Sequence, residues 1–132
     1  MHSCNTNRSS SACENSFTYT VVDHPLCIRE GNDFRLGFRF KDVDDLSVPL
    51  DNVQTILFKA RYGFKGSIAL SIPCEVDDPT AGTFWVPFTA TNTSGLGGRS
   101  GFSEYRYDIE FTYNDGRITS YMEGVLTVKS DV

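Results

Sequence analysis

The sequence predicts an all-β protein built from two antiparallel sheets packed face to face. Apolar residues recur at every second position through most of residues 16–128, which is the period of strands with one buried face. Turn residues separate these runs about every ten to fifteen positions, and no segment repeats with the period of a helix. Short strands at this spacing favour an immunoglobulin-like β-sandwich of about seven strands.

The chain divides into an extended N-terminal arm, residues 1–15, and one sandwich domain, residues 16–132. The arm is rich in Ser and Asn and almost lacks apolar residues, so it cannot bury a core of its own. Fully extended, an arm of this length spans roughly 50 Å, enough to cross onto a neighbouring subunit. It lacks the apolar stretch of a secretion signal, so we expect synthesis in the cytoplasm of the producing cell.

The first expected strands are "SFTYTVV" (16–22) and "DFRLGFRF" (33–40). The second is the clearest in the chain, because every even-numbered residue in it is apolar. Three more strands follow at 53–62, 67–73 and 83–89, with polar turns between them. Pro87 indicates an edge strand or a bulge in the last of these.

A small-residue loop, "TATNTSGLGGRSG" (89–101), leads into a closing hairpin rich in tyrosine. Tyr105, Tyr107 and Tyr113 share the inward face of its first strand, and "NDG" (114–116) predicts a tight turn. Gly124 marks a bulge in the return strand. We expect these phenols to be core residues first, with hydroxyl groups that find partners at the sandwich rim.

The four cysteines show no metal-binding spacing. We expect Cys27 and Cys74 to be free thiols that act as small core hydrophobes. Cys4 and Cys13 lie in the arm, where pairing with each other in an oxidising medium is the alternative to free thiols. No cofactor or metal is expected.

Charge and hydropathy exclude two large classes of partner. The formal net charge is −5, and the Lys and Arg residues are scattered singly, so the basic patch of a nucleic-acid-binding protein is missing. No apolar run reaches the ~20 residues of a membrane helix. We therefore expect neither nucleic acid nor membrane as a partner.

No catalytic constellation stands out. His24 lies beside Asp23 and near Cys27, but no third group is tied to this pair, and we expect no activity from it. "GLGGRSG" (95–101) lacks the Lys-Ser/Thr ending of a phosphate-binding loop. Acidic residues cluster in two predicted turns, where Asp is favoured for backbone reasons, with Ca²⁺ binding and carboxylate catalysis as the alternatives. They are Asp42, Asp44, Asp45, Glu75, Asp77 and Asp78.

The closing hairpin also carries a family resemblance. The pairs Tyr107-Asp108, Asp115-Gly116 and Glu123-Gly124, followed by "LTV" (126–128), resemble the small immunoglobulin-like virion and tail proteins of tailed bacteriophages. The N-terminal domain of phage baseplate upper proteins is similar. The resemblance covers about 110 residues, everything except the arm. The loop at 89–101 and the cysteine-containing arm depart from the pattern.

The resemblance implies a non-enzymatic structural component of a phage particle, in the tail, baseplate or neck. Its partners would be other phage structural proteins, with this chain present as a homo-oligomer or as repeated copies in a symmetric ring. It would reside in the virion after synthesis in the host bacterial cytoplasm. The expected contacts are the arm, the 89–101 loop and the sandwich edges. The individual residues proposed are Asn5, Arg8, Cys13, Phe17, Leu96, Arg99 and Phe102.

Two alternatives stay open at this point. A head decoration protein would share the fold and differ only in its partner. A host-surface or carbohydrate-binding module would instead present an exposed aromatic platform, formed by Tyr62, Phe64 and Trp85.

Overall fold

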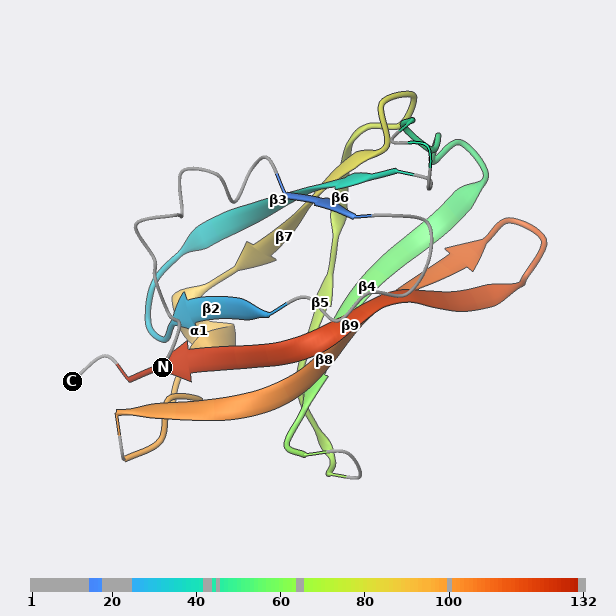
Figure 1. Ribbon diagram of the computed structural model, residues 1–132. Coiled ribbons are helices and arrows are strands. Elements are labelled where there is room, and N and C mark those ends of the chain that lie inside the picture. The colour runs from blue at the N-terminus through green and yellow to red at the C-terminus, as the bar shows by residue number, and fades with distance from the viewer. Residues whose placement is uncertain are drawn as a thin grey trace.

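The structure is a computed structural model that describes residues 15–17, 25–41, 44, 46–63, 66–99 and 101–130. Over these residues the chain forms nine strands and one helical turn (Figure 1). They are β1 (Asn15–Phe17), β2 (Leu26–Arg29), β3 (Phe34–Phe40), β4 (Val53–Arg61), β5 (Ile68–Pro73), β6 (Glu75–Asp78), β7 (Thr83–Phe88), α1 (Ala90–Thr93), β8 (Phe102–Tyr113) and β9 (Ile118–Lys129). No described helix is long or apolar enough to cross a membrane.

The strands form two sheets that confirm the predicted β-sandwich. One sheet has four strands in the order β1-β3-β7-β6, and the other has five in the order β2-β9-β8-β4-β5. The order β9-β8-β4 corresponds to the G-F-C order of an immunoglobulin-type sandwich, and the order β3-β7-β6 corresponds to B-E-D. The twelve-residue strands β8 and β9 are the longest, and they run the length of the molecule (Figure 1).

The structure differs from the sequence prediction in strand number, in strand direction and in the place of one bulge. The register of β8 and β9 shifts at Tyr121, whereas Gly124, where the bulge was expected, pairs in register with Tyr107. The segments Leu26–Arg29 and Glu75–Asp78 are strands rather than connections, which raises the strand number above seven. The first alternates in burial but has only four residues, too few to establish a period, and all four residues of the second are exposed. The sheets are also not wholly antiparallel, because β1 pairs with β3 and β2 pairs with β9 in parallel. Of the strand expected at 16–22, residues 18–22 lie outside the described residues.

The core lies between the inward faces of the two sheets and is dominated by aromatic rings. The Phe58 ring stacks on Tyr107 with 5.2 Å between centroids and meets Phe88 edge-on at 5.4 Å. Phe58 is completely buried and Tyr107 nearly so. These contacts join β4 and β8 of one sheet to β7 of the other, so ring packing fixes the two sheets together.

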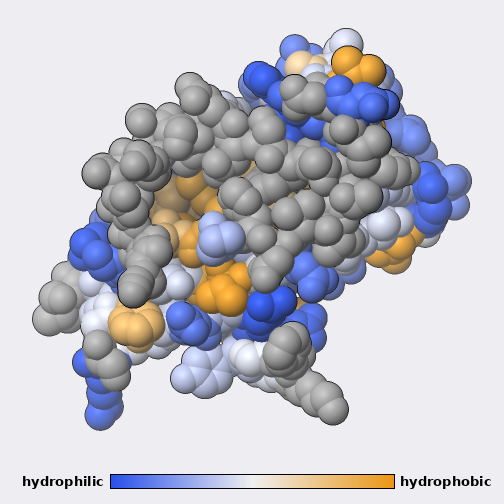
Figure 2. Space-filling view, in the orientation of Figure 1, coloured by the Kyte–Doolittle hydropathy of each residue, from blue (hydrophilic) through white to orange (hydrophobic). Residues whose placement is uncertain are grey.

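The outer surface mixes hydrophilic and hydrophobic residues. On the face shown in Figure 2, hydrophilic residues alternate with small, separated hydrophobic patches in the described part of the chain. The exposed large hydrophobic residues come from six different places in the fold: Leu46, Tyr62, Ile68, Val76, Phe102 and Ile118. Scattered apolar residues of this kind are normal for a soluble surface and do not by themselves mark an interface.

Two sheet edges are poorly suited to pairing with another chain. Next to the β5 edge, the Cys74 amide donates to the Ile56 carbonyl of β4. Because backbone groups alternate in direction along a strand, those of the preceding residue, Pro73, face the unpaired side of β5. Proline has no N–H, so it offers no donor there to another strand. The register between β4 and β5 then shifts and skips Ala69. At the other edge, β6 is fully exposed and acidic. Proline, bulges and charges are the usual protections of an edge strand.

The turns gather at two opposite ends of the sandwich. The segment between β3 and β4, the β6–β7 turn and the β8–β9 turn lie at one end, whereas α1 and the end of β9 lie at the other (Figure 1). At the first end, Leu50 donates its amide to Pro79 and Asn114 donates to Asn52. At the second end, the Ser130 amide donates to Gly101. We call these the pocket end and the loop end.

Candidate functional site

The predicted contact residues fall into two groups. Leu96, Arg99 and Phe102 are described, and all three lie at the loop end. Phe17 lies in β1, where its backbone pairs with Phe40, and its side chain is outside the described part of the structure. The other predicted residues, Asn5, Arg8 and Cys13, lie outside the described residues.

The 89–101 loop is held firmly at its centre. The Glu30 carboxylate accepts the amides of Gly95 and Gly97, with the shorter bond to Gly97 at 2.8 Å. A side chain at Gly97 would lie 2.4 Å from Glu30 and 2.5 Å from the Ser130 backbone, so only glycine fits this close approach. The loop is therefore a fixed surface, not a free tether.

Two further contacts join this loop to its neighbours. The Tyr105 hydroxyl donates to the Leu96 carbonyl at 2.7 Å. A tyrosine near the start of this strand, bonded back to the preceding connection, is a recurring feature of immunoglobulin-like sandwiches. At the start of α1, the Thr89 side chain accepts the Asn92 amide, and the Asp33 carboxylate accepts the Ala90 amide.

The predicted contact residues of the loop end differ in whether a partner can reach their side chains. Leu96 is half-buried and packs against the core, so its side chain contributes to folding. Arg99 is exposed, and the Phe102 side chain retains 52% of its accessible surface. Arg99 and Phe102 are therefore the described members of the predicted set that a partner can reach.

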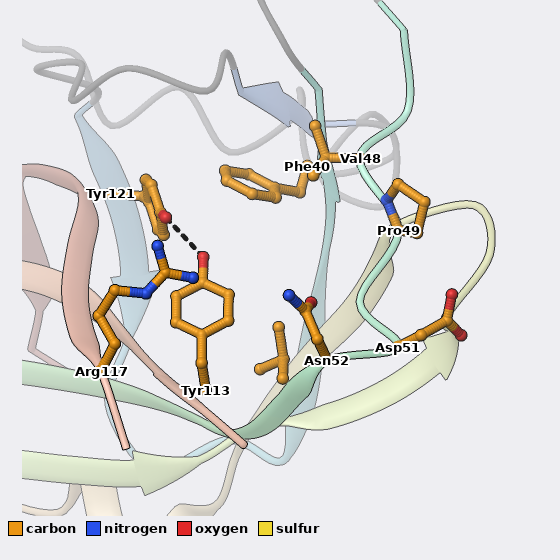
Figure 3. Close-up of a pocket in the computed structure, with 9 residues that line it drawn as sticks. Phe40, Val48, Pro49, Asp51, Asn52, Tyr113, Arg117 and Tyr121 are labelled. Carbon is orange, nitrogen blue, oxygen red and sulfur yellow. Dashed lines mark hydrogen bonds between the residues drawn. The ribbon is translucent and has the colours of Figure 1, made fainter. Parts of the chain in front are cut away.

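The pocket end carries a concavity that the sequence did not predict. Its volume is about 390 Å³, within the range of small-molecule sites. Figure 3 shows its lining: Phe40, Val48, Pro49, Asp51, Asn52, Val53, Tyr113, Arg117 and Tyr121. Residues from β3, from the segment before β4 and from both strands of the closing hairpin converge here, although they are far apart in the sequence.

Backbone hydrogen bonds fix the walls of this pocket. Val48 donates its amide to the Phe40 carbonyl at 2.8 Å, and Leu50 donates to Pro79 at 2.7 Å. The Leu50 side chain is buried and anchors the segment from below. Across the pocket, the Asn114 amide donates to the Asn52 carbonyl at 2.9 Å. The pocket is thus formed before any ligand arrives.

The floor and mouth of the pocket differ in chemistry. Phe40, Tyr113 and Tyr121 are buried, and the Tyr113 hydroxyl donates to the Tyr121 hydroxyl. The Arg117 guanidinium lies over the Tyr113 ring, 4.2 Å from its centroid, and points toward the two hydroxyls (Figure 3). Among the described residues, no carboxylate forms an ion pair with Arg117.

In the 75–78 cluster, Asp77 and Asp78 have turn functions, whereas Glu75 lies 3.9 Å from the Arg35 guanidinium. The Asp78 carboxylate accepts the amides of Thr80 and Ala81, and the Asp77 carboxylate accepts the Thr83 hydroxyl. These bonds are typical of an Asx-type turn. The described residues contain no group of three or more metal-ligating side chains. In the first acidic cluster, Asp42 and Asp45 lie outside the described residues, as do His24 and Asp23.

The cysteine prediction was wrong for Cys27. This residue is half-buried on β2 and disulfide-bonded, and its partner lies outside the described residues. Cys74 is a free thiol packed against the core, as expected. Burial raises the pKa of the Cys74 thiol to about 12, so it is a poor nucleophile at neutral pH.

The described members of the aromatic platform do not lie together. Tyr62 follows β4 in the five-stranded sheet and contacts the Tyr105 ring. Trp85 lies on β7 in the four-stranded sheet, under the Arg35 guanidinium at 4.4 Å. The third residue, Phe64, is outside the described residues.

The outer face of the five-stranded sheet carries a charged row across β4, β8 and β9. Lys59 pairs with Glu110 at 3.0 Å, and Arg106 pairs with Glu123 at 3.7 Å. Between these pairs, one carboxylate oxygen of Asp108 is buried without a hydrogen-bond partner. Burial is the main cause that raises the pKa of Asp108, and Lys59 opposes it.

The fold is similar to that of a solved phage domain, the "N-terminal domain of phage TP901-1 ORF48". The TM-score is 0.52 at 10% sequence identity, and the match covers 89% of this chain and 95% of that chain. A structure of murine CRIg aligns over 82% of this chain and 92% of that one at 10% identity. Its TM-score of 0.36 is too low to support an argument.

No protein-family model matches the chain, and no curated protein matches it. At 10% identity the likeness to the phage domain concerns the fold alone. What that comparison establishes is a phage-like β-sandwich.

Proposed function

We propose that this protein is a non-enzymatic structural component of a tailed bacteriophage particle, located in the tail, baseplate or neck. The observation that carries the proposal is the shared fold with the phage TP901-1 domain, which extends over nearly the whole of both chains. The hairpin residues Tyr107-Asp108 and Glu123-Gly124 support it independently through the sequence resemblance. Virion residence follows from the same role.

The sandwich serves as the rigid body in this proposal. Aromatic packing between the sheets and the Glu30 contacts to the 89–101 loop leave little freedom at the loop end. A preformed surface avoids the entropy cost of ordering side chains and loops on association. Repeated copies in a symmetric ring would use such a surface to fix the angle between neighbours.

The most suitable described contact at this surface is Phe102, with Arg99 beside it in the chain. Interface anchors are enriched in aromatic residues and Arg, and an exposed aromatic ring on a rigid strand start is a suitable anchor. The protected edges of β5 and β6 make strand pairing at that side of the sandwich a poor alternative. The N-terminal arm, residues 1–15, is the second proposed contact, and its last residue, Asn15, opens β1.

The first test is mass spectrometry on purified particles of the phage that encodes the chain. We expect the protein in stoichiometric amounts relative to the other particle proteins. Its absence from intact particles, despite expression in the infected cell, would overturn the proposal.

The second test maps the contacts by light scattering with particle extract added. Full-length protein is compared with a variant lacking residues 1–14 and with Phe102→Ala. Ile118→Ala is the matched control, because Ile118 is equally exposed but lies at the pocket end. We expect the full chain and the control to join a larger assembly and the other two variants to join it less. If all four proteins assemble equally, the assigned contacts are wrong.

A further inference from the structure

The pocket end carries a preformed pocket to which the proposed structural role assigns no function. We propose that this pocket binds an acidic monosaccharide, a sugar ring that carries a carboxylate, with Arg117 holding the carboxylate at the mouth. The proposal does not depend on the particle role, because the pocket is lined by residues of the pocket end, whereas Arg99 and Phe102 belong to the loop end.

The first argument is Arg117, an exposed cation that no described carboxylate pairs with. Its guanidinium lies 4.2 Å from the centre of the Tyr113 ring, a contact that favours this position at the mouth. The planar guanidinium presents a fork of donors that matches a carboxylate with two parallel hydrogen bonds. The Asp51 carboxylate, the only acidic group in the lining, points away from the two tyrosines (Figure 3).

The second argument is the neutral polar chemistry around Arg117. The Asn52 amide, which both donates and accepts, projects into the pocket toward the tyrosines (Figure 3). The hydroxyls of Tyr113 and Tyr121 meet beside it. A purely apolar acid would cover the exposed Asn52 amide without replacing its hydrogen bonds to water, which is costly. A ring that carries several hydroxyls supplies both donors and acceptors.

The third argument is shape. The Phe40 ring and the two tyrosines close the floor, and Val48 and Pro49 form an apolar wall (Figure 3). The C–H face of a sugar ring is apolar and fits against such a wall, while its hydroxyls face the polar side. Because hydrogen bonds already hold Val48, Leu50 and Asn52, binding does not require the walls to be ordered first.

Two nearby charges oppose binding. The Asp115 carboxylate accepts the backbone amide of Arg117 at 2.9 Å, so its negative charge lies close to the mouth. Asp51 adds a second negative charge at the rim. We therefore expect modest affinity that weakens as salt screens the contact with Arg117.

The experiment is an NMR titration of the full-length protein with sodium glucuronate, with glucose as the neutral sugar and acetate as the acid without a ring. We expect glucuronate to bind at least about tenfold more tightly than either, because it alone makes the charged pair and the hydroxyl contacts. The amide shifts should concentrate in residues 48–53 and 113–121.

Three variants test the assignment. Arg117→Gln should remove the preference for glucuronate over glucose, whereas Asp51→Asn should raise glucuronate affinity. Arg39→Gln is the matched control: it makes the same charge change at an exposed residue on the outer face of β3 and should leave binding unchanged.

Each other outcome overturns the proposal in a distinct way. Equal binding of glucose and glucuronate would show that Arg117 does not recognise the carboxylate. Equal binding of acetate and glucuronate would show that the sugar ring contributes nothing. Absence of shifts with all three ligands would leave the pocket without this function. None of these results bears on particle assembly, which is measured separately.

Discussion

At the scale of single residues, the tyrosines of the closing hairpin differ in where their hydroxyl groups end. Tyr107 is a core ring stacked on Phe58. Tyr105 ends at the rim, where its hydroxyl reaches the Leu96 carbonyl, and Tyr113 ends at the pocket, where its hydroxyl meets Tyr121. The expectation that inward phenols find partners at the rim is confirmed for Tyr105 and Tyr113. The aromatic hairpin thus contributes rings to the core between the sheets and places tyrosine hydroxyl groups at both ends of the sandwich.

Tyr105→Phe tests the rim contact. The substitution keeps the ring and removes only the hydroxyl, which leaves the Leu96 carbonyl without this donor. We expect the free energy of unfolding to fall by about 1 kcal/mol, measured by urea denaturation with an unchanged m-value. Tyr62→Phe is the control, because Tyr62 is exposed and its ring contacts Tyr105. Equal effects of both variants would show that the hydroxyl bond contributes nothing specific.

At the scale of elements, the sequence was sufficient to predict a strand where one face of that strand is buried, and insufficient where neither face is. In β3 the side chains of Leu36, Phe38 and Phe40 are buried and the two arginines of the strand are exposed, so its bounds were predicted almost to the residue. In β6 every residue is exposed, and its strand conformation comes from pairing with β7. Pairing of this kind depends on the partner strand and leaves no period in the sequence.

The pocket was missed for a related reason. Its walls meet through the contact between Asn52 and Asn114, which are far apart in the chain. Each segment alone has the composition of an ordinary turn, so only the folded arrangement brings residues 48–53 against Arg117 and the two tyrosines of the closing hairpin. The fold was therefore predictable from local patterns, and the candidate site was not.

Glu30→Gln tests how the 89–101 loop is held. A neutral amide replaces the carboxylate that accepts the Gly95 and Gly97 amides, so at least one of these bonds weakens. We expect hydrogen-exchange protection of the two amides to fall about tenfold, with protection in β8 and β9 unchanged. Glu104→Gln makes the same charge change at an exposed residue and should have no effect. Unchanged protection in Glu30→Gln would mean that the loop is fixed by other contacts.

At the scale of the whole molecule, the two ends of the sandwich are chemically distinct. The loop end presents a fixed backbone surface with exposed Arg99 and Phe102. The pocket end presents a concave, partly aromatic site. The disulfide of Cys27 adds a covalent link from β2 to a segment outside the described residues.

Peptide mapping without reductant tests the cysteine assignment. We expect the Cys27 peptide cross-linked to a peptide that carries Cys4 or Cys13, the remaining cysteines, and the Cys74 peptide as a free thiol. Because the pKa of Cys74 is about 12, its alkylation at pH 8 should be slow in the native protein and fast after unfolding. A free Cys27 in protein purified without reductant would contradict the disulfide.

The raised pKa also sets a direction for stability. The ordinary thiol pKa is 9.0, and the folded value is about 12. The unfolded chain therefore loses this proton first, so the contribution of Cys74 to stability is complete below pH 9 and is lost as pH rises toward 12.

The parallel pairing of β2 with β9 has a mechanical consequence. Leu26 lies beside Leu126 and Arg29 beside Lys129, so the two strands run in the same direction. If the chain is pulled from the start of β2 and the end of β9, the strands slide along each other, and all their hydrogen bonds carry load together. A hairpin pulled at its open end instead breaks one bond at a time. A force applied between the start of β2 and the end of β9 is thus resisted more strongly than a force that separates the two strands of a hairpin.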